Sequence, residues 1–192
     1  RGCKTMCVPP LIDKSDPKWD YSDNAKSNDI VTLCYVGNPG AGAKDKLDRI
    51  VYALDRVLQS KPSIKIVLQI VGMTKEQYEE AFGNEKPENG FVHFFGRLSN
   101  KEALSIIKAS DYSIFIRDTN LVCTAGFPTK FVESIACGTP VLTNHTSDIG
   151  KYLNNGINGY GLDVSSDEKL VESLVQALSV NREKIEEMKQ AC

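Results

Sequence analysis

Short apolar runs alternate with amphipathic segments along most of this chain, and that alternation limits the fold more than any other feature of the sequence. The apolar runs are rich in β-branched and aromatic residues and span 30–36, 64–71, 91–95, 112–116 and 140–142. Most positions in these runs are apolar, and apolar and polar residues do not alternate, as expected for strands buried on both faces. The amphipathic segments between them are 45–60, 74–83, 100–110 and 128–137. This order predicts a doubly wound, Rossmann-like α/β domain in which a parallel sheet lies between two layers of helices.

The helical segments carry signals for their buried faces and their first residues. In segment 45–60 one helical face holds Leu47, Ile50, Val51, Leu54, Val57 and Leu58. Thr74 and Asn100 stand just before the next two helical patterns and are predicted N-caps, because their side chains can accept a hydrogen bond from a free amide of the first turn.

The length of 192 residues favours a single domain, 1–192, with a core large enough to need no disulfides. Residues 5–13 form a short strand-like run that two prolines end, and the polar stretch 14–29 is predicted to be a long loop. Residues 165–192 form a C-terminal helical segment, either one long helix or two helices that meet near Ser179. The chain does not begin with Met, so we expect it to be a piece of a longer protein.

Composition and charge exclude several classes of function. Hydrophobic residues make up 41%, charged residues 25%, and the net charge is −2, which gives no support for a nucleic-acid partner. No apolar run is long enough to span a membrane, and the first ten residues lack the apolar core of a signal peptide. The cysteines are Cys3, Cys7, Cys34, Cys123, Cys137 and Cys192. Their spacing does not fit a zinc site, Cys34 and Cys137 are predicted buried hydrophobes, and we expect a cytoplasmic location with no metal or cofactor.

Parallel sheets bind ligands outside the carboxyl ends of their strands, so the residues that follow each predicted strand are the first candidates. The first strand is followed by the glycine-rich loop Gly37–Lys46, whose backbone amides suit a phosphate. It matches neither the P-loop nor the dinucleotide fingerprint, because Asp45 stands where each requires another residue. A flexible turn with Asp45 as a helix cap therefore remains an alternative, although Lys44 is well placed to neutralise a phosphate.

Polar side chains also follow the later strands. Arg97 follows the third strand, Arg117 and Asp118 follow the fourth, and His145 follows the fifth. The alternative for each arginine is a surface salt bridge, which is the commoner role of a single arginine. His145 could donate to a phosphate or a sugar hydroxyl, or it could face solvent.

The crossover after the fourth strand contains the sharpest motif, AGFPTKFVESIACGTPV, from Ala125 to Val141. Gly126 lets the backbone approach a ligand closely, and Pro128 suits the first position of a helix. The free amides of that helix start favour a diphosphate. Glu133 follows about one turn later, and an acidic side chain beside a phosphate site suits ribose hydroxyls; the alternative is a solvated helical glutamate.

These residues resemble the donor domain of GT-B-fold glycosyltransferases, in particular the retaining family 4 (group 1) type, whose E-x7-E element reads EGFP-x4-E-A-x-A-x-G-x-PVV. The matches here are Gly126, Phe127, Pro128, Glu133, Ala136, Gly138, Pro140 and Val141. The segments CVPPLID, YVGNPGAGAKD, IVLQIVG, FVHFFGRLS, ASDYSIFI and LNNGINGYGLD follow in the family's order, so the resemblance covers nearly the whole chain.

The resemblance implies a role for each matching residue. Glu133 would bind the donor ribose, and Lys44 would contact the diphosphate together with the backbone of Gly126, Phe127 and Pro128. The backbone around Arg97 and Leu98 would hold the base, and Gly37 would allow close approach of the donor. No catalytic residue is assigned.

Two departures from the family pattern concern the donor site. The first glutamate of E-x7-E is Ala125 here, so we expect the donor sugar to be held differently, or by another group such as Asp118 or Thr124. The usual arginine after the first glycine is Asn38, a donor-site position without the charge. We expect Arg117 or Arg97 to compensate for that missing charge.

The resemblance also implies what lies outside these residues. A GT-B enzyme places the donor between two domains, and the N-terminal acceptor domain is absent here, so we expect this chain alone to transfer nothing. The implied parent is a hexosyltransferase-like enzyme that uses a UDP- or GDP-sugar, in bacterial capsule or surface polysaccharide synthesis, and that meets a membrane only through the absent domain. The alternatives are a GT-B-like binding module that has lost catalysis, a nucleotide-sugar epimerase of the same fold, and a generic flavodoxin-like domain.

Overall fold

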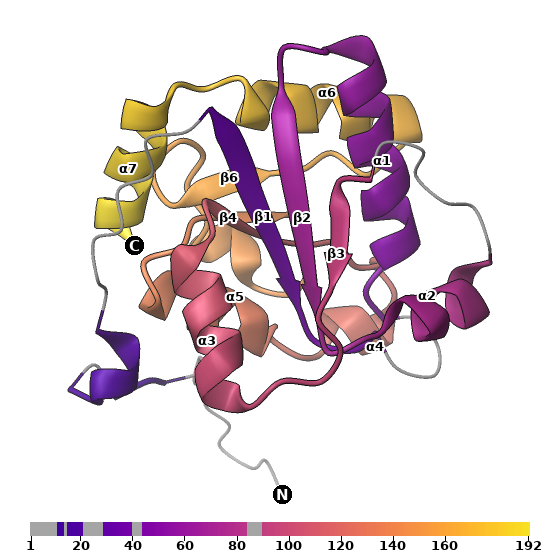
Figure 1. Ribbon diagram of the computed structural model, residues 1–192. Helices are drawn as coiled ribbons and strands as arrows, with labels where there is room; N and C mark the ends of the chain where they lie inside the picture. Colours follow the sequence, from indigo (N-terminus) through magenta and orange to yellow (C-terminus); the bar gives the residue numbers. More distant parts are fainter. Residues whose placement is uncertain (1–10, 14, 21–28, 40–43, 84–89) are drawn as a thin grey trace, which may run out of the picture.

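The computed structural model describes residues 11–13, 15–20, 29–39, 44–83 and 90–192 of the chain. Its centre is a six-stranded parallel sheet with the order β3-β2-β1-β4-β5-β6 (Figure 1). The strands are β1 (Ile30–Val36), β2 (Lys65–Val71), β3 (Val92–Phe94), β4 (Tyr112–Phe115), β5 (Val141–Thr143) and β6 (Gly159–Gly161). The predicted doubly wound, Rossmann-like α/β fold is confirmed.

Helices cover both faces of this sheet. They are α1 (Leu47–Ser60), α2 (Lys75–Phe82), α3 (Asn100–Ala109), α4 (Leu121–Thr124), α5 (Thr129–Ala136), α6 (Asp167–Leu178) and α7 (Arg182–Ala191). Leu33 and Tyr35 of β1 share a hydrophobic cluster with α1, whereas their neighbours Cys34 and Val36 share one with α3. Because successive side chains of a strand point to opposite faces, α1 and α3 lie on opposite sides of the sheet.

Five predicted strands are present within one residue or two of their expected limits, and β1 matches its prediction at both ends. The strand β6 was not predicted, because two of its three residues are glycines and the run GYG has no apolar pattern. Gly159 has a φ of 147° and lies so close to the backbone of Val141 that a side chain there would overlap it. Backbone pairing with β5 therefore forms most of this strand's contacts, and Tyr160 is its one side chain that packs against the core.

The helix ends confirm some predicted caps and correct others. Thr74 caps α2 in a capping box with Gln77, as predicted. The prediction for Asn100 was wrong: Ser99 is the N-cap of α3, because Glu102 stands three residues later and completes the box. Of the two C-terminal alternatives, the structure has two helices, since Asn181 caps a new helix after α6 ends.

Most of the predicted core residues are buried, whereas the N-terminal segment differs from its predicted strand and loop. Five of the six predicted apolar residues of α1 are buried, and Leu58 packs against the same cluster. Cys34 and Cys137 are buried as predicted, and burial raises the pKa of Cys137 to about 11, which keeps its thiol protonated. Residues 17–19 of the predicted loop form a 3-10 turn, and residues 11–13 are not a strand; the remaining part of run 5–13, with Cys3 and Cys7, lies outside the described residues.

A buried ion pair ties α7 to the start of the sheet. Arg182 donates to the carboxylate of Asp111, which is fully buried and also accepts from the amide of Thr32 at 2.7 Å. Arg182 donates as well to the carbonyl of Ile30 at 3.2 Å. In Figure 1, α7 lies near the start of β1 and α4 lies at the opposite end of the strands. Within the described ranges, no helix has the length and apolar character that crossing a bilayer requires.

Candidate functional site

The strand order identifies one point on the sheet as the first place to look for a ligand. Counting from β1, the chain builds toward β2 and β3 on one side and then toward β4, β5 and β6 on the other. In such a sheet the two connections that leave β1 and β4 diverge, and ligands bind outside the carboxyl ends of those strands. Here the segment after β1 meets the segment after β4 directly: Asp45 bridges Arg117, and the amide of Lys46 donates to the carbonyl of Ile116 at 2.9 Å.

A buried charge network, Tyr35–Asp45–Arg117–Lys130, occupies this switch point. Asp45 is 2% exposed, and its carboxylate accepts from Arg117 Nε at 2.7 Å, from the Tyr35 hydroxyl at 2.9 Å, and from Lys130 Nζ. Lys130 also donates to the Tyr35 hydroxyl at 3.1 Å and lies over the Tyr35 ring. Side chains from β1, from the segment before α1, from the segment after β4 and from α5 are thus joined through one carboxylate.

The pKa shifts of the network have physical causes in this burial. Burial alone would raise the pKa of Asp45, but Lys130 and Arg117 outweigh it and hold that pKa below 3.8. Burial lowers the pKa of Lys130 below 10.5, and the attraction of Asp45 opposes this. Burial and the Asp45 charge raise the pKa of Tyr35 above its usual range, so the hydroxyl stays protonated and can donate.

Two alternatives from the sequence are therefore corrected. Asp45 is not a helix cap, because Lys46 is the N-cap residue of α1 and Asp45 faces the network instead. Arg117 is not in a surface salt bridge, because its side chain is only 11% exposed where it meets Asp45. Asn144, which follows β5, holds the backbone of Arg117 with two hydrogen bonds of 2.9 and 2.8 Å.

Three glycines end neighbouring strands beside the network. Gly37, Gly72 and Gly96 follow β1, β2 and β3, and their φ angles are 143°, 102° and 61°. They are joined in a row, since the amide of Gly72 donates to the carbonyl of Gly96 at 2.7 Å and the amide of Gly37 donates to Val71 at 2.9 Å. The φ of Gly37 is one that other residues rarely adopt, and a Cβ there would also displace the end of the Lys130 side chain, whose Cε would be 2.6 Å away, so glycine is favoured at this strand end.

The start of α5 faces the same edge. Pro128 is the N-cap rather than the first helical residue, and it makes no side-chain capping bond, so the first-turn amides depend on other acceptors. Gly126 is exposed, and a Cβ there would contact nothing, which agrees with open space beside its backbone. Phe127 packs edge-on against Phe131 and Tyr152, with ring centroids 5.8 and 5.5 Å apart, and fixes the approach to the helix.

Glu133 lies one turn into α5 and is half-buried, unlike the solvated glutamate of the alternative interpretation. Burial raises its pKa above 4.5, while the charges of Lys130 and Lys18 act in the opposite direction. Lys18 belongs to the 3-10 turn whose Trp19 packs against the cluster of Cys34 and α3. The carboxylate of Glu133 is thus bordered by a cation on its own helix and by one on the N-terminal segment.

The other predicted site residues lie farther out on the same edge. Lys44, Asn38, Arg97 and Thr124 are exposed, and Leu98 is half-buried. Asp118 forms an exposed ion pair with Lys46 at 3.0 Å. The exposed ring of His145 lies against Gly150 and Gly161, beside β6. Among the contacts described above, Arg117 is the polar predicted residue that joins the buried network.

Lys130, Tyr35 and Asn144 were not predicted as site residues. Lys130 stands in an amphipathic helix, where a lysine is usually solvated, and Tyr35 stands in a strand, where an aromatic residue is usually core. The signal that could have drawn attention to them is Asp45, a carboxylate that stands in a glycine-rich loop where known phosphate-binding fingerprints require another residue. In the described residues no cluster of three or more His, Cys, Asp or Glu could hold a metal ion.

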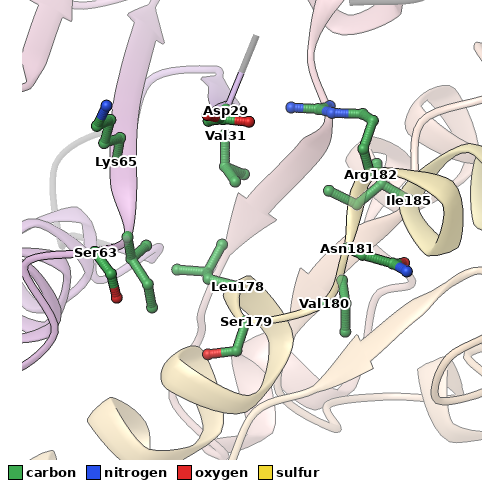
Figure 2. A pocket seen from close by; sticks show the side chains of 11 residues that line it. Asp29, Val31, Ser63, Lys65, Leu178, Ser179, Val180, Asn181, Arg182 and Ile185 are labelled. Carbon is green, nitrogen blue, oxygen red and sulfur yellow. The ribbon is translucent and has the colours of Figure 1, made fainter. Parts of the chain in front are cut away.

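A pocket of about 390 Å³ lies at the other edge of the sheet, away from the network. It is lined by the starts of β1 and β2 and by the junction of α6 and α7, including Asp29, Lys65, Leu178 and Arg182 (Figure 2). This is the amino-terminal edge, where α/β sheets do not bind their ligands. We therefore assign the candidate site to the switch point and not to this pocket.

Comparison with known families covers almost the whole chain. A sequence model of the family "Glycosyl transferases group 1" matches residues 23–191. A protein of Methanocaldococcus jannaschii described as an uncharacterized glycosyltransferase, MJ1069, is 24% identical over 166 residues, which are 84% of this chain and 40% of that protein.

Solved structures agree on the fold. WaaG, described as a glycosyltransferase involved in lipopolysaccharide biosynthesis, superposes with a TM-score of 0.62 at 22% identity over 88% of this chain and 45% of its own. The C-terminal domain of the group 1 protein LpcC from Francisella tularensis has a TM-score of 0.66 at 16% identity over 94% of both chains. Staphylococcus aureus TarM, solved with UDP and a sugar ligand, has a TM-score of 0.62 at 12% identity over 87% of this chain and 32% of its own. The chain thus spans less than half the length of MJ1069, WaaG and TarM and nearly all of the LpcC domain.

Proposed function

The chain belongs to the group 1 glycosyl transferases and has the Rossmann-like fold of one domain of a GT-B enzyme, and from this we propose that it is the donor-binding domain of a sugar transferase. Its ligand is a nucleotide-diphospho-sugar. The observation that carries the proposal is the convergence of the Gly37 loop, Arg117 and the start of α5 at the switch point of the sheet. That is where α/β sheets take nucleotides, and it is also where the motif from Ala125 to Val141 lies.

The chemistry of each residue assigns it to one part of the donor. Glu133 binds the ribose hydroxyls, because its half-buried carboxylate can accept hydrogen bonds from hydroxyl groups. It cannot bind a phosphate, since two anions repel each other. The diphosphate lies over Gly37 and the uncapped amides after Pro128, with Lys44 as an exposed counter-charge. The backbone beside Arg97 and Leu98 borders the base.

The structural neighbour TarM was solved with UDP, and WaaG is described as involved in lipopolysaccharide biosynthesis, which supports a nucleotide sugar as donor and a surface polysaccharide as product. A domain that provides the acceptor site belongs to the remainder of such enzymes, so we propose that transfer needs more than these residues. The parent enzyme transfers a hexose or a related sugar in the cytoplasm of a bacterium.

One observation favours a second candidate, a binding module without catalysis. Ala125 stands where the family has the glutamate that contacts the donor sugar, and it is exposed at the end of α4. The neighbouring Thr124 hydroxyl donates within α4, to the carbonyl of Asn120 at 2.6 Å. Turnover of a nucleotide sugar by the full-length parent supports the transferase, whereas tight nucleotide binding without turnover supports the module.

The donor proposal is tested by titrating the chain with UDP, GDP, ADP and CMP, followed by thermal shift or NMR. We expect one of the diphosphates to bind and its 2′-deoxy form to bind more weakly. Glu133→Ala should remove the difference between ribose and deoxyribose forms, and Glu172→Ala, an exposed glutamate on α6, should leave it unchanged. Absence of binding to every nucleotide contradicts the donor-domain proposal, and a ribose preference that survives Glu133→Ala contradicts the role of Glu133 alone.

A further inference from the structure

The charges of the buried network do not cancel. Two cations, Arg117 and Lys130, meet one carboxylate, Asp45, and their side chains are only 11%, 15% and 3% exposed. Buried charges are normally paired, because removing an ion from water is costly. The next carboxylate is Glu133, which lies one turn along α5 and which the donor proposal assigns to the ribose. The network by itself therefore carries one surplus positive charge close to the sheet edge.

The surplus charge lies where a diphosphate would. Lys130 is in the first turn of α5, a helix start with no side-chain cap, and its ammonium group lies against the backbone of Gly37. The helix dipole and the free amides of that turn add to the positive potential there. Asn38 brings no charge to this edge, so the sequence lacks a cation where the family usually has one.

The two arginines predicted to compensate are less well placed. Arg117 uses its Nε on Asp45, and Asn144 fixes its backbone, so its guanidinium is held inside the network. Arg97 is exposed after β3, two strands away from β1 in the sheet order. The Lys130 ammonium group has three N–H donors, and two of them go to Asp45 and Tyr35, which leaves one for a phosphate. Lys130 is also the one cation of the network that belongs to the helix start itself.

We propose that Lys130 is a donor-binding residue that contacts the diphosphate of the nucleotide sugar, with Asp45 and Tyr35 holding its ammonium group in place. This rests on the proposed donor function. The phosphate adds a second anion to a lysine that Asp45 already orients, and the side chain therefore needs little reordering when the donor binds. The diphosphate also brings negative charge to a network that Asp45 alone leaves with one surplus positive charge.

The test compares each nucleoside diphosphate with its own nucleoside, because only the former presents phosphates. We expect Lys130→Gln to weaken UDP, GDP or ADP, whichever binds the wild type, by about tenfold, as loss of a charge-assisted hydrogen bond implies. The affinity for the matching nucleoside should change by less than about twofold, since the proposed contacts to the ribose and the base are unaltered. A purely structural role of Lys130 would weaken both ligands alike.

Two further variants keep the result interpretable. Lys130→Gln leaves Asp45 with fewer partners, so the double variant Lys130→Gln, Asp45→Asn removes that carboxylate and restores the net charge of the network. We expect it to lack the preference for diphosphate as well. Arg182→Gln breaks the buried ion pair with Asp111 at the opposite edge of the sheet. We expect this variant to keep the preference for the diphosphate over the nucleoside even though its fold is less stable.

The outcomes separate the two proposals. A wild type that prefers no diphosphate to its nucleoside contradicts both the donor function and the role of Lys130. A wild-type preference that persists in Lys130→Gln, or that returns in the double variant, overturns only the role of Lys130. Selective loss of the preference in both Lys130 variants and its retention in Arg182→Gln is the result that the structure leads us to expect.

Discussion

Removing the carboxylate of Asp45 should destabilise the fold far more than removing that of Asp118. Asp45 pairs with Lys130 of α5 and Asp118 pairs with Lys46 at the start of α1, but the Asp45 side chain is 3% exposed and that of Asp118 is 49% exposed. Asp45→Ala leaves Lys130 and Arg117 buried side by side without a counter-charge. Breaking a buried pair costs about 3–5 kcal/mol, and since both cations keep some contact with solvent we expect about 3 kcal/mol. Asp118→Ala should cost about 0–1 kcal/mol, as surface pairs do.

The assay is urea unfolding followed by the fluorescence of Trp19, the only tryptophan, and by circular dichroism. A domain of this size has roughly 5–15 kcal/mol of stability, so Asp45→Ala should remain folded in water. The pH dependence gives a second check with Asp45→Asn. Because the folded-state pKa of Asp45 lies below 3.8, its charge stabilises the fold above pH 3.8 and this contribution is lost as the pH falls through the folded-state pKa. Equal losses in Asp45→Ala and Asp118→Ala, or a gap between wild type and Asp45→Asn that does not shrink at low pH, would refute the reasoning.

Three more predictions concern the glycine row, the opposite edge and the ribose carboxylate. Gly72→Ala should cost about 2–4 kcal/mol in urea unfolding, because its φ is 102° and a Cβ would lie 2.5 Å from the carbonyl oxygen of Gly37; a loss below about 1 kcal/mol contradicts this. Arg182→Leu should cost about 3 kcal/mol by the same assay, because it leaves the fully buried carboxylate of Asp111 without its cation, and an unchanged midpoint would argue against that pair. Burial raises the pKa of Glu133 above 4.5, so protonation favours the folded state and that contribution is lost as the pH rises through the folded-state pKa. The thermal unfolding midpoint of Glu133→Gln should therefore be higher than that of wild type at pH 7, and this difference should disappear at pH 4. A midpoint below that of wild type at pH 7 would exclude a desolvated carboxylate.

The sequence was sufficient for the sheet because its strands are short, apolar and separated by amphipathic helices. Side-chain pattern forms those elements, so it also reveals them, as with β1 and α1. It failed at β6 and α4 for a physical reason. The first is held by backbone pairing between Gly159–Gly161 and β5, and the second is a single turn capped by Asn120. Neither of these leaves an apolar period in the sequence.

The candidate site was predicted as a region but not as a network. The rule for carboxyl ends identified the Gly37 loop, Arg117 and the start of α5, and the structure brings these together. Which charges pair could not be predicted, because Asp45 and Lys130 are 85 residues apart and meet only through the fold. A helical lysine and a loop aspartate have no local signal that distinguishes burial from exposure, so Lys130 was not predicted as a site residue and Asp45 was interpreted as a possible cap.

The measurement that tests the central claim most directly is an NMR map of backbone amides in the chain titrated with the nucleoside diphosphate that binds it. Binding at the switch point predicts shifts at Gly37, Gly96, Gly126 and Glu133, with the largest changes in the first turn of α5. Shifts that gather instead around the pocket of Figure 2, at the starts of β1 and β2 and at the junction of α6 and α7, would contradict the account.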